Sequence, residues 1–131
     1  MKKILLIVLF LSVGFSQRLN EVIETYENGN IKSITSHKET RNRIEKVEYV
    51  EYYENGNKKE EATYKDGQKD GLLTRWHENG QKSKEGTYKD GLPDGSWNGW
   101  YDNGQKEFEG TYKGKKAISE KVWNKDGSVK E

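Results

Sequence analysis

A unit of 24 residues that recurs with little change is the feature that most constrains how this 131-residue chain can fold. The turns Asn55-Gly56, Asn79-Gly80 and Asn103-Gly104 lie 24 residues apart. Two series of aromatic residues keep the same step, namely Tyr64, Tyr88 and Tyr112, and Trp76 with Trp100. A fixed period of this length is typical of a repeat array, because one copy cannot bury its apolar face alone. We therefore expect similar units that each pack against their neighbours.

Each unit contains two turn motifs, which predict β-hairpins. Asn-Gly or Asp-Gly between short runs indicates a two-residue hairpin turn, since both central residues need a positive φ angle that these residue types tolerate. The second set of turns is formed by Asp66-Gly67 and Asp90-Gly91. The stretches between turns are long enough for one strand each, and residues 17–131 carry no helical stripe. The predicted fold is therefore all-β, an array of antiparallel β-hairpin repeats of about 24 residues.

The residues that keep phase with the repeat form its predicted frame, and they are aromatic residues and glycines. They are Tyr64, Trp76, Gly80, Gly86, Tyr88, Trp97, Trp100, Gly104, Gly110, Tyr112 and Trp123. Ala62, Gly86 and Gly110 share one repeat position, and a glycine inside a strand often marks close approach by another group. We expect the tryptophan of an adjacent strand to lie over this position. Trp97 and Trp100 have opposite parity, so either both faces of the sheet carry aromatic rings or a bulge separates the two residues.

The first residues indicate a secretory signal peptide. Lys2 and Lys3 precede an apolar run over residues 4–11, and Gly14-Phe15-Ser16 supplies small residues before a cut near Ser16. The alternative is a retained membrane anchor, although this run falls short of the roughly 18 apolar residues that span a bilayer. We therefore expect an exported protein that resides in the periplasm, in the cell envelope or outside the cell.

Three parts of the chain are predicted. Residues 1–16 are the signal peptide, residues 17–52 are a divergent N-terminal repeat region with the related turn Tyr26-Glu-Asn-Gly, and residues 53–131 are the regular array. The chain contains no cysteine, which excludes disulfides, thiolate metal sites and lipid attachment at a cysteine. Packing and backbone hydrogen bonds must therefore hold the fold together.

The composition argues against an enzyme, a cofactor or metal site, and a nucleic-acid partner. His37 and His77 are the only histidines, and neither has a second ligand at metal-binding spacing. The Asp-Gly turns lack the ligand pattern of calcium-binding loops, and no nucleophile with an oriented base can be assembled. Residues 53–112 contain nine basic and twelve acidic residues, so they lack the positive charge that phosphate binding requires. We expect no catalytic residue, cofactor or metal.

The stretch from Glu78 to Trp97 contains Glu-Asn-Gly-Gln-Lys, Glu-Gly-Thr-Tyr-Lys-Asp-Gly and Asp-Gly-Ser-Trp, and it resembles the bacterial variant of the MORN repeat. The resemblance covers residues 53–127 well and residues 26–52 poorly. It implies an elongated, twisted antiparallel sheet with a role in protein scaffolding or in attachment to membrane surfaces. Similar bacterial members are often labelled as antitoxin components of toxin and antitoxin pairs, so the resemblance also implies an antitoxin-like role as an alternative.

These features together predict an exported, non-enzymatic scaffold that binds another protein. Strand addition at an unpaired sheet edge would supply the main contact, and aromatic side chains left exposed on one face would mark a further interaction surface. The array ends shortly after Gly127 without completing a unit, so self-association through an open edge is also expected. Two alternatives stay open, namely a peripheral membrane-surface module and an antitoxin-like neutraliser.

Overall fold

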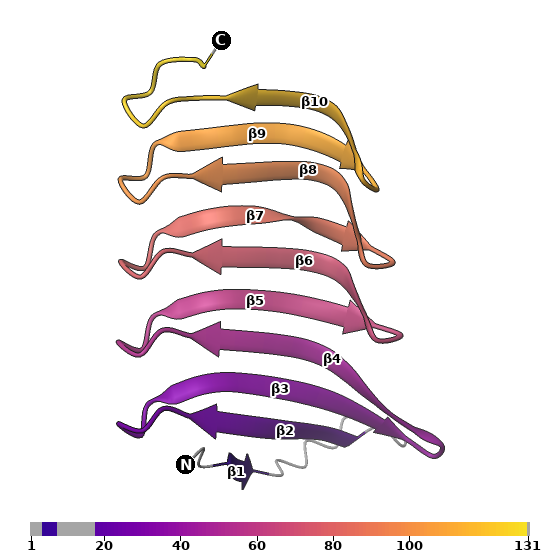
Figure 1. The fold of residues 1–131 in the computed structure, drawn as a ribbon. Helices are drawn as coiled ribbons and strands as arrows, with labels where there is room; N and C mark the ends of the chain where they lie inside the picture. Colours follow the sequence, from indigo (N-terminus) through magenta and orange to yellow (C-terminus); the bar gives the residue numbers. More distant parts are fainter. Residues whose placement is uncertain (1–3, 8–17, 131) are drawn as a thin grey trace.

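The computed structural model describes residues 4–7 and 18–130, and its regular elements in these ranges are all β-strands. The strands are β1 (Ile4–Ile7), β2 (Arg18–Thr25), β3 (Ile31–Thr40), β4 (Arg43–Tyr52), β5 (Lys58–Lys65), β6 (Gln68–Trp76), β7 (Lys82–Lys89), β8 (Leu92–Trp100), β9 (Lys106–Lys113) and β10 (Lys116–Val122). They form one sheet whose strand order is the chain order, and each strand pairs antiparallel with the next (Figure 1). The predicted array of antiparallel hairpins is confirmed.

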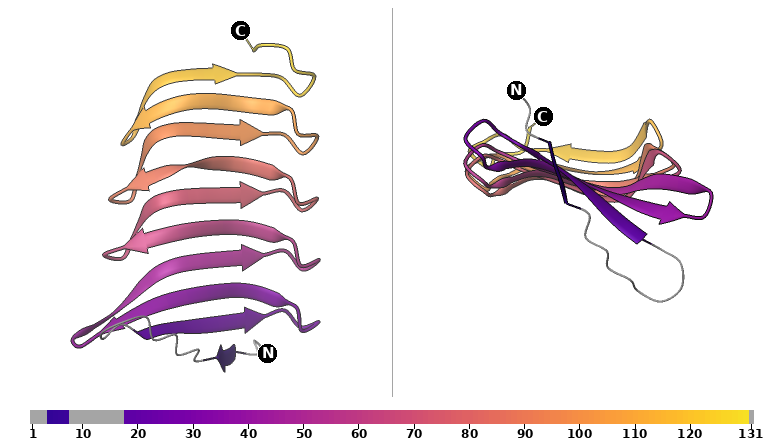
Figure 2. Two further views of the ribbon diagram at one scale, coloured as in Figure 1. Left: turned by 180° about the vertical axis from the view of Figure 1, so that it is seen from behind. Right: turned by 90° about the horizontal axis from the view of Figure 1, so that it is seen from below.

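The sheet is a single twisted layer that extends along the direction of the array. Seen from below, its strands are bent along their length and neighbouring strands are rotated relative to one another (Figure 2). Twist of this kind follows from the backbone geometry of L-amino acids. Residues 4–7 and 18–130 include no helix long and apolar enough to cross a membrane.

The Asp-Gly turns have the predicted form. β5 ends at Lys65 and β6 begins at Gln68, so two residues connect the strands. Asp66 and Gly67 have φ angles of 50° and 79°. Two consecutive positive φ angles are what the tight hairpin turn requires, because its backbone then matches the twist of the flanking strands.

The Asn-Gly turns are longer than predicted, and the two-residue prediction is wrong for them. β4 and β5 are joined by five residues, from Tyr53 to Asn57. The Tyr53 N–H donates to the Asn57 carbonyl at 2.8 Å, and the Gly56 N–H donates to the Tyr53 carbonyl at 2.9 Å. Gly56 has a φ of 90°, whereas Asn55 has an ordinary negative φ and accepts the Asn57 N–H through Oδ1 at 2.9 Å. Asparagine therefore serves here through its side chain rather than through tolerance of a positive φ.

Close packing over small residues forms the centre of the sheet. Trp97 pairs with Gly86 on one side and with Gly110 on the other. A Cβ atom at Gly86 would overlap the Trp97 ring, so the prediction of a tryptophan over this glycine is confirmed. One unit earlier Leu73 takes the place of Trp97 and pairs with Ala62, and both residues are 1% exposed. The large partner is therefore a tryptophan in only one of the units.

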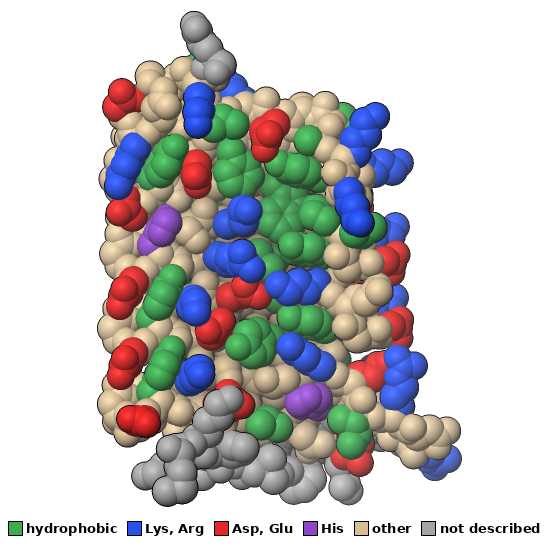
Figure 3. Space-filling view, viewed as in Figure 1, with side chains coloured by type: hydrophobic (Ala, Val, Ile, Leu, Met, Phe, Trp, Pro, Cys, Tyr) green, Lys and Arg blue, Asp and Glu red, His purple; other side chains and the backbone are tan. Residues whose placement is uncertain are grey.

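Aromatic side chains lie on both faces of the sheet. Of the two explanations for the opposite parity of Trp97 and Trp100, rings on both faces is therefore correct, and a bulge between the two residues is not. Trp97 lies on the face that also carries Tyr49, Tyr64, Tyr88, Phe108 and Tyr112, which we call the aromatic face. Trp100 pairs with Lys106 and points to the opposite face. Figure 3 shows the aromatic face, with hydrophobic side chains gathered over β6 to β9 and Lys and Arg side chains beside them.

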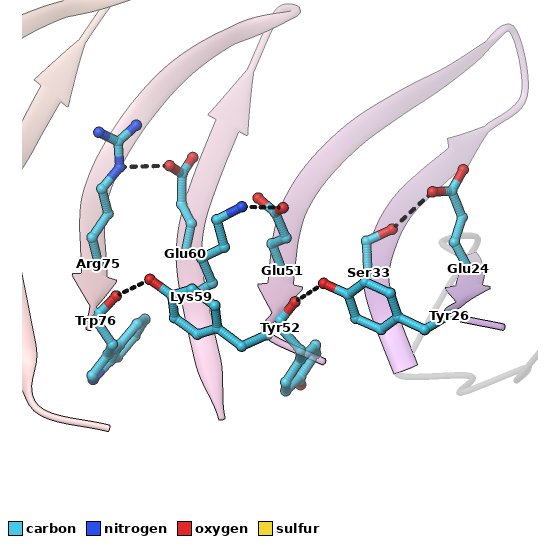
Figure 4. Close-up of polar contacts among 10 residues, drawn as sticks. Glu24, Tyr26, Ser33, Glu51, Tyr52, Lys59, Glu60, Arg75 and Trp76 are labelled. Atoms are coloured by element: carbon cyan, nitrogen blue, oxygen red, sulfur yellow. Dashed lines mark hydrogen bonds and ion pairs between the residues drawn. The ribbon is translucent and has the colours of Figure 1, made fainter. Parts of the chain in front are cut away.

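A ladder of side-chain hydrogen bonds links each Asn-Gly turn to the next unit. The Tyr26 hydroxyl donates to the carbonyl of Tyr52 at 2.7 Å, and the Tyr53 hydroxyl donates to that of Trp76 at 2.8 Å (Figure 4). Tyr101 donates to Trp123 in the same way. His77 replaces tyrosine in the third turn, and its Nε2 lies 2.7 Å from the Trp100 carbonyl. Because a carbonyl oxygen only accepts, Nε2 carries the hydrogen.

Side-chain amides form a second ladder beside the first. Asn55 and Asn57 both donate to the Glu78 carbonyl, at 3.0 and 2.8 Å. Asn79 and Asn103 repeat this contact one and two units later, with the carbonyls of Asp102 and Lys125. The turns are thus joined directly to one another, in addition to the strand pairing.

The N-terminal strand β1 falls within the predicted signal peptide. It pairs with β2 through Ile4 opposite Glu24 and Ile7 opposite Glu21. The predicted cleavage near Ser16 lies outside the described residues, so export stays a prediction. β2, β3 and β4 lie entirely within residues 17–52, the predicted divergent region, and they continue the same sheet.

Replacing Gly86 by valine should destabilise the protein strongly. Its side chain would occupy the space of the Trp97 ring, and overpacking of this kind costs about 1–3 kcal/mol or more. The midpoint of thermal unfolding, followed by circular dichroism, measures the loss. Glu85→Val is the matched control, since Glu85 lies on the same strand and contributes to an exposed ion pair with Lys82. Equal melting temperatures for Gly86→Val and Glu85→Val would refute this packing.

Replacing Tyr53 by phenylalanine should remove one step of the hydroxyl ladder. The Trp76 carbonyl then loses its side-chain donor, and we expect a loss of about 0.5–1.5 kcal/mol in the free energy of unfolding by urea. Tyr52→Phe is the control, because among the described residues the Tyr52 hydroxyl makes no hydrogen bond. A Tyr52→Phe loss as large as that of Tyr53→Phe would contradict the ladder.

Candidate functional site

The aromatic face has its densest packing around Trp97. The Tyr88 ring meets the Trp97 ring edge to face, with centroids 5.1 Å apart and an angle of 87°. Tyr112 approaches from the other side at 6.5 Å and 81°. Such arrangements stabilise ring pairs beyond the area they bury. Trp97 itself is buried, while Tyr88, Phe108 and Tyr112 remain partly exposed, so the cluster presents ring edges to a partner.

A shallow hollow opens in this cluster. It measures about 160 Å³ and is lined by Lys84, Tyr88, Pro93, Trp97, Phe108 and Tyr112. Its walls are apolar except for the Lys84 ammonium and the Tyr88 and Tyr112 hydroxyls. Tyr112 donates its hydroxyl to Glu120 at 2.6 Å, and this hydrogen bond raises the pKa of Tyr112. The hollow therefore suits an apolar side chain that has a polar or anionic neighbour.

Two lysines on the aromatic face lie over rings instead of pairing with carboxylates. Lys46 Nζ lies 4.4 Å from the Tyr49 ring centroid and 4.0 Å from that of Tyr64. Lys84 Nζ lies 5.2 Å from the Phe108 centroid and 5.8 Å from that of Trp97. Within the described part of the chain, neither ammonium has an acidic partner. Both positive charges are therefore available to an anionic group of a ligand.

The lower part of the same face holds an ion-pair network around Glu60. The carboxylate of Glu60 accepts hydrogen bonds from Lys69 at 2.9 Å and from Arg75 at 2.7 Å, and its side chain is 14% exposed. Burial by itself would raise the pKa of Glu60, but the bonds from Lys69 and Arg75 outweigh it and hold the pKa below its ordinary value. Lys59 pairs with Glu51 beside this network at 2.9 Å (Figure 4). Each of these three cations therefore has a carboxylate partner, and the group of five side chains keeps one net positive charge.

The structure distributes the predicted frame residues over three places. Gly80 and Gly104 lie in the Asn-Gly turns, with φ angles of 87° and 82°. The aromatic face receives the residues Tyr64, Gly86, Tyr88, Trp97, Gly110 and Tyr112. Trp76, Trp100 and Trp123 lie together on the opposite face. The prediction did not separate these two aromatic groups.

Sequence reasoning missed four residues of the aromatic face, namely Tyr49, Phe108, Lys46 and Lys84. Tyr49 stands 24 residues before Leu73 and 48 before Trp97, so a search for large residues opposite Ala62 and Gly86 would have found it. Phe108 shares its repeat position with Glu60 and Lys84, and this position carries no constant residue type. No periodic signal marks it, although its ring fills the space beside Gly99.

The two histidines occupy structural positions. His77 is part of the hydroxyl ladder, and His37 pairs with Asn20 on β2 and Lys46 on β4. Over residues 4–7 and 18–130, no three acidic or imidazole side chains are grouped in a way that would hold a metal ion.

Replacing Glu60 by glutamine should make stability depend less on pH. The lowered pKa of Glu60 means that its carboxylate stabilises the fold above its unfolded pKa, and this stabilisation disappears as the pH falls through the lower folded pKa. At neutral pH we expect Glu60→Gln to cost roughly 1–3 kcal/mol. In acid below the folded pKa, the variant and the original protein should unfold with closer free energies.

Urea unfolding at a series of pH values measures this dependence. Glu61→Gln is the matched control, because Glu61 lies next in the chain on the opposite face, in a more exposed pair with Lys58. An exposed pair contributes under about 1 kcal/mol. A Glu60→Gln loss that is the same at all pH values would show that the charge of Glu60 does not stabilise the sheet.

Comparison with known proteins identifies the repeat. The family model for the MORN repeat variant matches residues 47–66, 69–90 and 93–113. Each match begins on the strand that carries Tyr49, Leu73 or Trp97 and ends near the next tight turn, so the three matches follow the structural period. Neither the curated proteins nor the solved structures give a match. With three consecutive repeats in phase with its hairpins, the chain belongs to the MORN repeat variant family.

Proposed function

We propose that the protein is an exported, non-enzymatic scaffold that binds another protein through its aromatic face. MORN repeats are generally associated with protein or membrane interaction, and their all-β fold is typically a non-catalytic module. The observation that carries the proposal is the ring cluster around Trp97, which presents partly exposed rings and the unpaired Lys46 and Lys84 ammoniums on an open face.

The chemistry of this face defines the partner. Partly exposed rings and the hollow beside Lys84 favour an apolar side chain. The two unpaired ammoniums favour a carboxylate, because a charge without a partner gains most from a ligand of opposite sign. The partner is therefore a protein segment that combines apolar and acidic residues.

Strand addition at the C-terminal sheet edge is a weaker basis for partner binding than this face. β10 is exposed, but the chain after it folds back, with a bridge between Trp123 and Val129 and a hydrogen bond of 2.9 Å from the Lys130 N–H to the Val122 carbonyl. The outer strand also has a register irregularity between Ala117 and Ser119. Irregular edges disfavour pairing with another strand. Self-association through this edge is accordingly the lesser contact.

A membrane surface is the competing ligand for the same face. Lysines beside aromatic rings also suit a lipid interface, but the ion pairs around Glu60 and Glu51 leave few free positive charges there. An antitoxin-like role stays a prediction that would use the same protein-binding face.

Charge reversal at Lys84 tests the proposal. Affinity purification of the tagged, exported protein should recover a specific partner, and Lys84→Glu should weaken its binding by about tenfold or more. Lys65→Glu is the control, since it makes the same charge change at an exposed site next to a tight turn. Equal effects of the two variants would contradict a role of the aromatic face. Salt-sensitive binding to anionic vesicles, with no protein recovered, would favour the membrane alternative.

A further inference from the structure

We propose that the opposite face is a second binding surface, which takes a linear, neutral β-1,4-linked polysaccharide. Its central feature is a row of four aromatic residues that runs along the array, which we call the tryptophan row. The row consists of Tyr52, Trp76, Trp100 and Trp123. This surface is separate from the aromatic face and carries different chemistry.

The spacing of the row suits a polymer with a repeating disaccharide. Tyr52, Trp76 and Trp100 end β4, β6 and β8, so successive rings are two strands apart. Neighbouring strands lie about 4.8 Å apart, which places the rings about 9.5 Å apart along the array. Two sugar rings of an extended β-1,4-linked chain cover nearly this length. Each protein repeat would then meet one disaccharide, with ring after ring in the same relation to the ligand.

The charge of the row indicates a neutral ligand. A lysine is the cross-strand partner of three of the four rings: Lys58 pairs with Tyr52, Lys82 with Trp76 and Lys106 with Trp100. Each of these lysines forms an ion pair with the glutamate three residues later, and the pairs are Lys58–Glu61, Lys82–Glu85 and Lys106–Glu109. One positive and one negative charge therefore recur in every unit. Lys121, whose Nζ lies 5.0 Å from the Trp123 ring centroid, adds a further cation at the C-terminal end of the row. An anionic polymer such as a nucleic acid still gains little from this surface, because the recurring lysines are already neutralised.

The residues next to the row can hydrogen-bond with sugar hydroxyls. A shallow groove of about 360 Å³ lies over β8, β9 and β10 on this face. Its lining includes Ser96, Asn98, Glu109, Thr111, Ser119 and Lys121, together with Trp97, Gly110 and Glu120, which alternate with them along the strands. Hydroxyl, amide, carboxylate and ammonium groups together supply both donors and acceptors, and a sugar hydroxyl is both. Rings beside such groups match the two sides of a sugar, which are apolar C–H surface and hydroxyl rim.

The aromatic face differs from the tryptophan row in the arrangement of its rings, and this difference supports different ligands for the two faces. On the aromatic face the rings pack against one another around a buried centre, and the free ammoniums lie over them. In the tryptophan row the rings are two strands apart and partly exposed. Lysines lie near these rings too, as Lys58 does over Trp76 at 5.6 Å, but Lys58 is paired with Glu61. A compact apolar cluster suits a protein side chain, whereas an evenly spaced row suits a periodic chain.

Titration of the ¹⁵N-labelled protein with N-acetylchitohexaose tests the proposal. The four tryptophan indole N–H signals are separate reporters within one molecule. The signals of Trp76, Trp100 and Trp123 should shift on binding. The Trp97 signal should stay in place, because the Trp97 ring lies on the aromatic face, away from the row, and its Nε1–H donates to the Thr87 carbonyl. Affinity should rise from the disaccharide to the hexasaccharide as more of the row is covered.

Variants and a second sugar complete the test. Trp100→Leu should lower the affinity for the hexasaccharide by about tenfold, while Lys84→Glu on the aromatic face should leave it unchanged. Maltohexaose, whose α-1,4 linkage curves the chain away from a straight row, should not bind. The proposal is overturned if the hexasaccharide moves no indole signal, if it moves Trp97 as much as the row, or if affinity does not depend on length.

Discussion

The hydrogen bond from the first side chain of each Asn-Gly turn to the carbonyl before the next turn is the contact on which the rest of the sheet depends. A single-layer sheet has no second layer to fix the relation between hairpins, so strand pairing alone leaves it free to bend and twist. Tyr53 and its equivalents join residues that are 22 to 26 positions apart. The asparagine amides beside them add a second link, so successive turns are held together directly as well as through the paired strands.

The regular stacking of the repeats aligns equivalent side chains along the array, and the aligned side chains form two continuous surfaces. Because every second strand has the same sequence position at the same height, residues 24 apart line up along the array. On one face this brings Tyr49, Leu73 and Trp97 over Ala62, Gly86 and Gly110 and forms the compact core. On the other face it aligns tryptophans with neutralised lysines. The two surfaces have different chemistry, and the proposed protein and polysaccharide ligands follow from that difference.

Positions at which the residue type differs between repeats give the aromatic face its local chemistry. Phe108 stands where the earlier units have Lys84 and Glu60, and it extends the ring cluster towards the C-terminal strands. Glu60 instead gathers Lys69 and Arg75 into an ion-pair network in the first regular unit. The aromatic face therefore changes along its length from charged to apolar. A partner that lies along it would meet both environments in a fixed order.

The period of 24 residues and the turn motifs determined the fold class, because glycine and asparagine in phase leave few backbone conformations besides hairpins. They also determined that a large side chain covers Gly86. Only the tertiary structure decided that the Asn-Gly connections have five residues, since the ladder to the next turn depends on contacts between units. It also decided that Trp97 and Trp100 serve opposite faces, because the extra residue of the irregular register beside Trp100 lies on β9, between Lys106 and Phe108, and leaves the alternation along β8 intact.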